Sequence, residues 1–301
     1  MQQAMRVVLT GSSGLIGSAL VAALGRDGHD VARLVRSGAD PAQGRFAWDP
    51  AADVLDPRAL EGAGAVVHLA GESVAGRWTD SKKRRILESR VTGTRLVAEQ
   101  LAAMDRPPGV LVCASAIGFY GKRGERPLEE GDPGAHDFLA DVVKQWEAAC
   151  EPARQAGVRV VNTRFGIVLS RSGGALKAML PAFRLGVAGR LGSGRQGFSW
   201  VAIDDVVAAI GYAIESQQIA GPVNVTAPHP VTNEEFTKTL GQVLHRPTVL
   251  PAPAFALRLA LGEFSQEVLA GVKVLPRRLQ DSGFEFAYPE LEPALRHVLG
   301  R

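Results

Sequence analysis

The chain has 301 residues, of which 46% are hydrophobic and 22% charged. This balance is typical of a globular protein and excludes a disordered or fibrous chain. Lys and Arg number 34 and Asp and Glu 31, so the formal net charge is +3, too small by itself to indicate nucleic-acid binding. Cys113 and Cys150 are the two cysteines; they are too few for a disulfide framework or a metal cluster and favour a reducing compartment.

The apolar stretches predict neither a signal peptide nor a membrane span. The uncharged run 7–25 is interrupted by Gly, Ser and Thr, whereas a secretory segment is continuously apolar and a span needs about 20 mostly apolar residues. No other stretch is long enough. We therefore expect a soluble, cytoplasmic protein that does not bind a membrane.

Apolar runs typical of strands alternate with segments of helical period from the first residues onward. Strands are expected at 6–10, 30–35, 65–70, 110–114 and 158–162, and helices at 15–26, 79–104 and 137–155. Alternating strands and helices, with strands that are apolar throughout, predict a parallel sheet covered on both faces. Right-handed crossovers then give an α/β fold with a Rossmann-type doubly wound sheet.

After about residue 165 the alternation loosens. The segment 186–197 is a loop rich in Gly and Arg, and 204–215 again has helical period. Thr232 and Glu235 fit a capping box at the start of a helix. The chain is rich in proline from 247 to 253.

This change of rhythm predicts two lobes. We expect a dinucleotide-binding domain at 1–165, with further segments from 198–230, and a smaller substrate lobe at 166–197 and 231–301 that includes a small C-terminal domain from about 247. The tail should pack on the rest of the protein because it contains a dense apolar group. This group consists of Phe255, Leu257, Leu259, Leu261 and Phe264.

The most informative segment lies between the first strand and the first helix and has three glycines with the spacing G-x-x-G-x-x-G. Gly11 permits a tight turn, Gly14 lets a pyrophosphate approach the backbone, and Gly17 lets helix and strand pack closely. The helix N-terminus offers unpaired N–H groups to phosphates. The expected cofactor contacts are therefore Gly11, Ser12, Ser13, Gly14, Leu15, Ile16 and Gly17. A tight turn without a ligand is the alternative.

The end of the second strand favours NADP over NAD. An NAD site usually has Asp or Glu there to bind the ribose 2′-OH, but this chain has Arg36 and Ser37, and no carboxylate appears before Asp40. A guanidinium can pair with a 2′-phosphate, and a serine can donate to it. The alternative is that Arg36 is a solvated charge at a strand end.

Several motifs resemble those of the extended short-chain dehydrogenases/reductases. They are the glycine loop, His68-Leu-Ala-Gly71, the strand ending in Ser115, and Phe119-Tyr-Gly121. The chain is most similar to an atypical branch of this group, the epimerase family proteins, described as NAD-dependent epimerase/dehydratase-like. The segments that carry this similarity include Gly76-Arg-Trp78, Trp146-Glu147, Leu191 to Gln196, Ser199 to Asp205, Asn224 to Pro228 and Val274 to Leu279.

The resemblance covers nearly the whole chain, and its last segment falls in the branch's small C-terminal domain. It implies a Rossmann-type domain, a nicotinamide cofactor and a substrate in the cleft beside the second lobe. It adds five cofactor contacts to the expected site, namely Leu69, Ala70, Gly71, Arg90 and Arg164. For the two arginines, a structural ion pair is the alternative.

The usual catalytic pair of this superfamily is absent. Its Tyr-x-x-x-Lys motif uses Tyr as a general acid/base and Lys to lower the tyrosine pKa, but none of the three tyrosines here is followed by Lys at that spacing. The expected region contains Phe138 and Leu139, and Lys144 is one residue out of phase. The remaining catalytic candidates are Tyr120 and Ser115; the alternatives are an aromatic wall and a strand-end hydroxyl that bonds backbone.

Other polar residues have weaker claims to a site. Glu72 is either a general base or ribose ligand or an exposed charge in a loop. His68 lies within an apolar strand, so we expect a core histidine. The basic run 82–85 reads as a solvated helix face, while Arg190 and Arg195 flank a loop that either binds an anionic substrate or is merely flexible. Two tryptophans either line the cleft or belong to the core; they are Trp78 and Trp200.

Two functions remain open from the sequence. The first is an NADP(H)-dependent oxidoreductase or epimerase-like enzyme that acts on an unidentified small molecule, as a monomer or homodimer, without nucleic acid or metal. The second is a non-catalytic NADP(H)-binding sensor or regulator, which the missing Tyr-Lys pair suggests.

Overall fold

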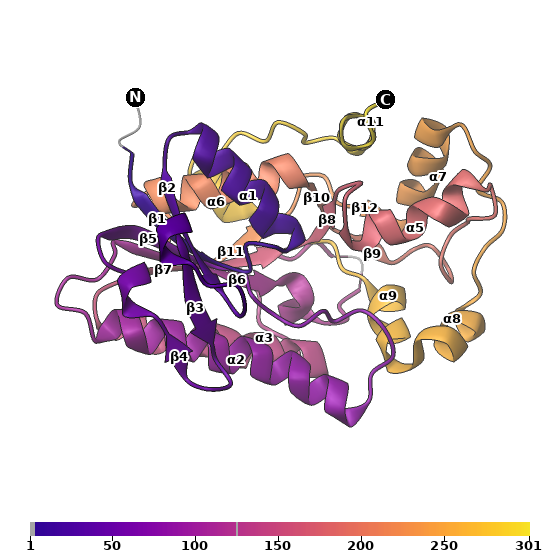
Figure 1. The fold of residues 1–301 in the computed structure, drawn as a ribbon. Coiled ribbons are helices and arrows are strands. Elements are labelled where there is room, and N and C mark those ends of the chain that lie inside the picture. Colours follow the sequence, from indigo (N-terminus) through magenta and orange to yellow (C-terminus); the bar gives the residue numbers. More distant parts are fainter. Residues whose placement is uncertain (1–3, 125) are drawn as a thin grey trace.

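The computed structural model describes residues 4–124 and 126–301, and its centre is one large twisted sheet with helices on both faces (Figure 1). In these described residues the sheet has eight strands in the order β11-β7-β6-β5-β1-β2-β3-β4. Neighbouring strands run parallel except β3 and β4. The order from β3 through β1 to β7 is that of a doubly wound dinucleotide-binding sheet, which confirms the predicted fold class.

The strands of this sheet are short and mostly apolar. They are β1 (Arg6–Thr10), β2 (Asp30–Val35), β3 (Arg45–Asp49), β4 (Val54–Leu55), β5 (Ala63–His68), β6 (Val110–Ala116), β7 (Arg159–Phe165) and β11 (Gly221–Val225). The helices that cover them are α1 (Leu15–Arg26), α2 (Asp80–Ala102), α3 (Phe138–Ala148), α4 (Glu151–Gln155) and α6 (Ile203–Glu215).

Residues of β1 divide between two cores. Val8 belongs to a cluster with α2 and α3 that includes Leu101 and Trp146. Val7 and Leu9 belong to the opposite cluster, with α1 and α6. Because successive side chains of a strand point to opposite faces, a strand covered on both faces must be apolar throughout, as the sequence pattern indicated.

The predicted helix 137–155 is wrong in one respect, because it is two helices. The chain turns at Ala149 and Cys150 between α3 and α4, and Pro152 lies in the first turn of α4. Proline has no N–H to donate to the carbonyl four residues earlier, so it cannot continue α3 and suits a helix start.

The second lobe has its own core. Its elements are β8 (Ile167–Leu169), α5 (Gly174–Arg184), β9 (Gly197–Phe198), β10 (Trp200–Ala202), β12 (Val231–Thr232), α7 (Asn233–Leu244) and α11 (Leu291–Leu299). Trp200 is completely buried in this core together with Phe236 and Leu295. The predicted capping box is confirmed: Thr232 Oγ1 accepts from the Glu235 N–H, and Glu235 accepts from the Thr232 N–H. The exact domain limits stay a prediction.

The C-terminal segment contains α8 (Ala254–Leu261), η4 (Gly262–Phe264), α9 (Ser265–Ala270) and α10 (Arg277–Asp281) before α11. Phe264 packs against Trp78 as expected. The expectation that the rest of the protein covers the apolar group is wrong for Phe255 and Leu259, which are 72% and 76% exposed. They project from α8, a helix with no buried residue.

Among residues 4–124 and 126–301, no helix combines the length and apolar character that crossing a bilayer requires.

Candidate functional site

The glycine loop between β1 and α1 is held in a compact turn. Gly11 has φ +68°, and a Cβ there would lie 2.8 Å from the backbone carbon of Leu69. A Cβ on Gly17 would overlap the carbonyl oxygen of Gly11. Larger residues are therefore excluded at both positions, and the loop rests directly on the segment that follows β5.

Gly14 has a different environment, because it is exposed and starts α1. A Cβ at Gly14 would meet only the carbonyl oxygen of Gly11, at 3.2 Å. No described side chain caps this helix N-terminus. The first N–H groups of a helix have no intrahelical acceptor. The loop therefore presents free backbone N–H donors next to the exposed Gly14.

Thr10 fixes the loop to β5. Its hydroxyl oxygen accepts from the N–H groups of Leu69 and Ala70, at 3.1 and 3.2 Å, and lies 2.8 Å from His68 Nδ1. With both acceptor positions used, the hydroxyl donates its own hydrogen to Nδ1. The imidazole proton therefore stands on Nε2.

His68 is a core histidine, as the sequence suggested. It is completely buried and lies edge-on to Trp48, and burial lowers the pKa of His68 to about 4. Nε2 has no hydrogen-bond partner among the described residues. The ring is therefore neutral at physiological pH and costs free energy to protonate.

Positive charge gathers where β2 and β5 end. Arg36 and Ser37 are exposed at the end of β2. Glu72 binds Lys82 at 2.7 Å and lies 3.9 Å from Arg85. The Lys82 hydrogen bond chiefly lowers the pKa of Glu72, and the charges of Arg85 and Arg36 add to this effect. The charges of three cations thus act on one carboxylate.

The basic run 82–85 is less free than the sequence suggested. Lys82 pairs with Glu72, and Lys83 pairs with Glu263 of the C-terminal segment at 2.6 Å. Arg85 also lies 3.9 Å from Glu72, so three of the four cations pair with acids of other segments.

Arg90 lies beside Gly71, where the resemblance places a cofactor contact. Its Nη1 donates to the carbonyl oxygens of Glu72 and Ile86, and its guanidinium lies 4.9 Å from the centre of the Trp146 ring. A Cβ on Gly71 would lie 3.5 Å from the Arg90 guanidinium carbon. Burial lowers the pKa of Arg90 to about 10.

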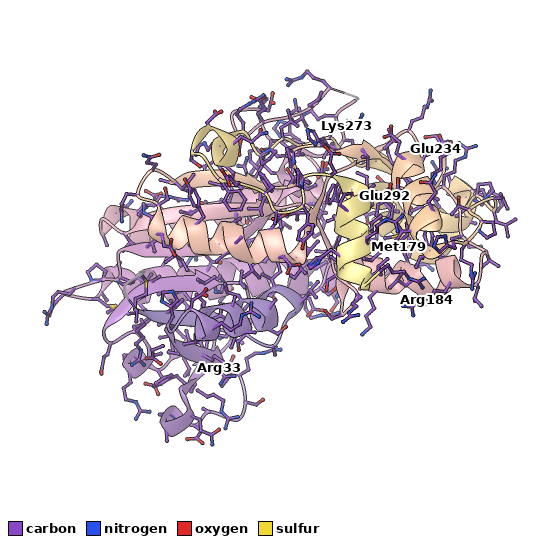
Figure 2. All side chains as sticks on the ribbon, turned by 90° about the horizontal axis from the view of Figure 1, so that it is seen from above. Arg33, Met179, Arg184, Glu234, Lys273 and Glu292 are labelled. Carbon is purple, nitrogen blue, oxygen red and sulfur yellow. The ribbon has the colours of Figure 1, made fainter. Side chains whose placement is uncertain are left out.

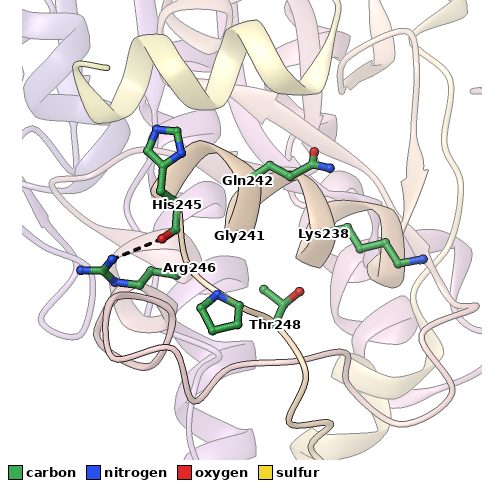
Figure 3. Close-up of a pocket in the computed structure, with 7 residues that line it drawn as sticks. Lys238, Gly241, Gln242, His245, Arg246 and Thr248 are labelled. Carbon is green, nitrogen blue, oxygen red and sulfur yellow. Dashed lines mark hydrogen bonds between the residues drawn. The ribbon is translucent and has the colours of Figure 1, made fainter.

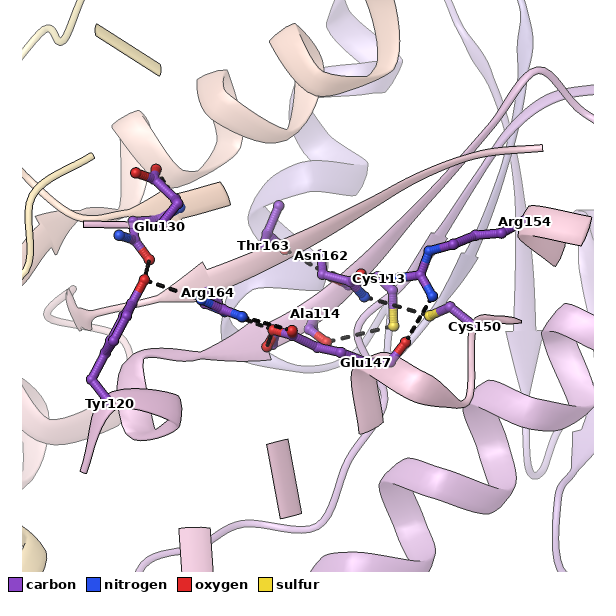
Figure 4. Close-up of polar contacts among 12 residues, drawn as sticks. Cys113, Ala114, Tyr120, Glu130, Glu147, Cys150, Arg154, Asn162, Thr163 and Arg164 are labelled. Carbon is purple, nitrogen blue, oxygen red and sulfur yellow. Dashed lines mark hydrogen bonds and ion pairs between the residues drawn. The ribbon is translucent and has the colours of Figure 1, made fainter. Parts of the chain in front are cut away.

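The catalytic candidates meet in one buried network, in which Figure 4 shows Tyr120, Arg164 and Glu147. Ser115 donates to Glu147 Oε1 at 2.6 Å, and both carboxylate oxygens of Glu147 accept from Arg164 at 2.8 Å. Arg164 also donates to the Tyr120 hydroxyl at 3.1 Å, and that hydroxyl donates to Asn224 Oδ1 at 2.8 Å. The structure thus brings Ser115, Tyr120 and Arg164 together through Glu147.

Tyr120 is buried and fully hydrogen-bonded within this network. Its side chain is completely buried, and burial raises the pKa of Tyr120. Its hydroxyl both accepts and donates a hydrogen bond within the protein. Sequence reasoning missed Glu147 and Asn224 as partners, although both fall in segments that carry the family resemblance.

The start of α3, where the superfamily's Tyr-Lys pair is expected, has apolar side chains instead. Leu139 lies against Gly118 of η3 (Ile117–Tyr120), where a Cβ would be 3.4 Å from the Leu139 Cβ. Phe138 meets Trp78 edge-on with ring centres 5.0 Å apart. Lys144 Nζ donates to the carbonyl oxygen of Ala135 and pairs with Asp141.

The other residues singled out from the sequence lie in the second lobe. Trp200 is a core residue, and Arg190 and Arg195 are exposed. A shallow hollow at the end of α7 is lined by Lys238, His245 and Arg246 among others (Figure 3). Within the described ranges, no three His, Cys, Asp or Glu side chains are grouped to hold a metal ion.

A doubly wound sheet with this glycine turn at the end of its first strand is a Rossmann-type fold. The sequence profile of the NAD dependent epimerase/dehydratase family matches residues 7–226, and the chain belongs to that family. A second profile, a domain of unknown function (DUF1731), matches residues 252–298. The family predicted from the sequence is confirmed.

Three relatives illustrate the similarity. Epimerase family protein Mb2239 from Mycobacterium bovis is 43% identical over 98% of both chains. The crystal structure of human epimerase family protein SDR39U1 with NADPH is 34% identical, with a TM-score of 0.90 over 99% of this chain and 100% of that one. A structure titled nucleoside-diphosphate sugar epimerase from Corynebacterium glutamicum is 37% identical, with a TM-score of 0.83 over 99% of this chain and 59% of that one.

The buried His68 predicts a loss of stability in acid. Its pKa is about 4 when folded and 6.5 ordinarily, so the unfolded chain binds more protons between these values, and the free energy of unfolding falls as the pH drops from about 6.5 to 4. The loss from this group is about 3 kcal/mol. Urea unfolding of the wild type and of His68→Gln across this range measures it.

The difference in unfolding free energy between the two proteins should shrink as the pH falls. His136→Gln, which changes an exposed histidine, should keep the wild-type slope. Parallel pH profiles for the wild type and His68→Gln would show that the buried ring does not titrate as expected.

Proposed function

We propose that this protein binds NADPH across the ends of β1, β2 and β5. The main support for this proposal is the glycine loop. Gly11 and Gly17 leave no room for a side chain, whereas Gly14 is exposed beside the N-terminus of α1, which no described side chain caps. That cradle suits a pyrophosphate. Family membership supports the proposal, and so does the human SDR39U1 structure, whose title names NADPH. NADPH would supply a hydride.

The choice of NADPH over NADH follows from charge. Arg36 is exposed and, with Lys82 and Arg85, acts on Glu72. Three cations against one carboxylate leave an excess of positive charge for a 2′-phosphate, and Ser37 adds a hydroxyl. A strand-end Asp or Glu would instead repel that phosphate.

Arg36→Ala should remove most of the preference for NADPH. A guanidinium–phosphate contact at a partly exposed site contributes about 2 kcal/mol, or roughly thirtyfold in affinity. We expect the wild type to bind NADPH at least about tenfold more tightly than NADH, with a difference that narrows as salt is raised. Calorimetric titration of both cofactors measures this.

Arg84→Ala removes the same charge from an exposed position on α2 and should leave the preference unchanged. Equal binding of both cofactors by the wild type at low salt would make Arg36 a surface charge and overturn the choice of cofactor.

The glycine loop yields a paired prediction. Gly14→Val should fold, because its φ of −75° suits any residue, but the side chain should occupy the phosphate position and abolish NADPH binding. Gly17→Ala should instead unfold more readily, because its methyl group overlaps the Gly11 carbonyl. Thermal melting separates the two effects. Undiminished NADPH affinity in a folded Gly14→Val protein would remove the loop from the site.

The reaction we infer is oxidoreduction or epimerisation of a small molecule at the ends of β6 and β7. Of the two residues predicted to be catalytic, Ser115 and Tyr120, we assign the proton exchange to Ser115 and a positioning role to Tyr120. Ser115 has a carboxylate acceptor at 2.6 Å, which suits proton exchange. Tyr120 is fully buried and holds Arg164, so its expected contribution is to keep the Glu147–Arg164 pair in place. Arg90 and residues 69–71 complete the proposed cofactor contacts.

Steady-state oxidation of NADPH with a panel of carbonyl compounds and nucleotide sugars tests this reading. Ser115→Ala should lower kcat by about a hundredfold or more and leave NADPH affinity intact. Tyr120→Phe should lower the free energy of unfolding by about 1–3 kcal/mol, because Arg164 and Asn224 each lose a buried partner. Tight NADPH binding without turnover of any compound would favour the non-catalytic sensor.

We also propose the cytoplasm as the location. Cys113 and Cys150 are free and buried thiols, which fits a reducing compartment.

A further inference from the structure

Strongly exposed large apolar side chains gather on one part of the second lobe. Seven such side chains occur in residues 4–124 and 126–301. One is Val54 on β4. The other six form what we call the apolar edge, namely Leu185, Val187, Val249, Leu250, Phe255 and Leu259.

The residues of the apolar edge come from two segments of the chain that lie next to each other. Arg246 Nε donates to the carbonyl oxygen of Arg184 at 2.9 Å, and the Ala252 N–H donates to that of Arg190 at 3.0 Å. Segments 184–190 and 246–252 therefore run side by side. Helix α8 follows directly, at the outer end of the second lobe (Figure 1).

On α8 the exposed residues share one face. Phe255 and Leu259 are four residues apart, so they lie one turn apart on the same side. The helix buries none of its residues. It thus presents an apolar surface that nothing in the described chain covers, and such surfaces usually mark binding sites.

The charges around the apolar edge are positive. Arg184, Arg190, Arg246 and Arg258 are all exposed, and neither 171–203 nor 245–262 contains Asp or Glu. Figure 2 shows Arg184 at the outer end of this lobe, well away from Arg33 on the sheet. Nearby acids are already paired, because Glu234 binds Lys238 and Glu263 binds Lys83.

We propose that the apolar edge docks on the surface of a membrane that contains anionic lipids. Apolar side chains that enter the headgroup region, together with a rim of arginines, are the features of peripheral membrane binding. This binding needs no spanning helix. It differs from the sequence-based expectation of a protein that does not bind a membrane.

A second copy of the chain fits this surface less well. A symmetric dimer places the same patch on both subunits, so two positively charged patches that contain Arg246 and Arg258 would face each other. An anionic surface instead attracts these residues. The proposal is independent of NADPH binding, because the apolar edge shares no residue with the glycine loop.

Co-sedimentation with lipid vesicles tests the proposal. The full chain is mixed at low salt with vesicles of phosphatidylcholine alone or with an equal amount of phosphatidylglycerol. We expect binding to the anionic vesicles at least about tenfold stronger than to the neutral ones, and weaker in high salt. The double variants Phe255→Ser/Leu259→Ser and Arg246→Glu/Arg258→Glu should each lose about tenfold or more in partitioning.

Val54→Ser is the matched control, because it removes an exposed apolar side chain from the other end of the protein. It should bind anionic vesicles like the wild type, and all variants should keep wild-type melting temperatures and NADPH affinity. Failure to bind anionic vesicles, or equal binding by Phe255→Ser/Leu259→Ser, would overturn the proposal.

Two further outcomes would also overturn it. Light scattering that shows a dimer lost only in Phe255→Ser/Leu259→Ser would assign the edge to a second copy. Binding to soluble polyglutamate as tight as to vesicles would show that charge alone, without a lipid surface, explains the attraction.

Discussion

The ion pair between Arg164 and Glu147 is the interaction on which the geometry of the strand ends depends. Arg164 is 3% exposed, and a charge so deeply buried is tolerated only when it is paired and its hydrogen bonds are satisfied. Arg164 donates hydrogen bonds from Nε and Nη2 to the Glu147 carboxylate and from Nη1 to the Tyr120 hydroxyl. Its guanidinium carbon lies 3.5 Å from the centre of the Phe119 ring. Removal of any partner leaves a costly buried charge.

The same network reaches into the C-terminal segment. Asn224, which accepts from Tyr120, donates through Nδ2 to the carbonyl oxygen of Leu275. Its N–H donates to Glu130, which also accepts from the N–H of Arg278. The ends of β6, β7 and β11 and the segment before α10 are therefore linked by one chain of hydrogen bonds. This linkage ties the C-terminal segment to the strand ends of the sheet.

Local patterns in the sequence predicted the sheet and the glycine loop because both depend on residues that are close together in the chain. Gly11, Gly14 and Gly17 lie within seven residues of chain, and the apolar run of β1 is visible over five residues. The partners of Tyr120 are different. Asn224 is 104 residues away, and no spacing rule predicts which strand end a buried hydroxyl will meet. The exposure of Phe255 and Leu259 was also hidden, because an apolar helix face looks the same in sequence whether the protein covers it or leaves it open.

The C-terminal segment connects the apolar cluster around Trp78 with the apolar edge. Helix α8 ends at Leu261, and Glu263 and Phe264 follow at once, the first paired with Lys83 and the second packed on Trp78 with ring centres 5.6 Å apart. Trp78 in turn meets Phe138, so η4 closes the apolar region where the family's Tyr-Lys pair would stand. Phe138 and Leu139 cannot exchange a proton, so the proposed proton-exchanging group is Ser115 of β6, and its acceptor Glu147 comes from the last turn of α3. The segment is therefore fixed at η4 by Lys83 and Trp78, while α8 presents an apolar face that the described chain leaves uncovered.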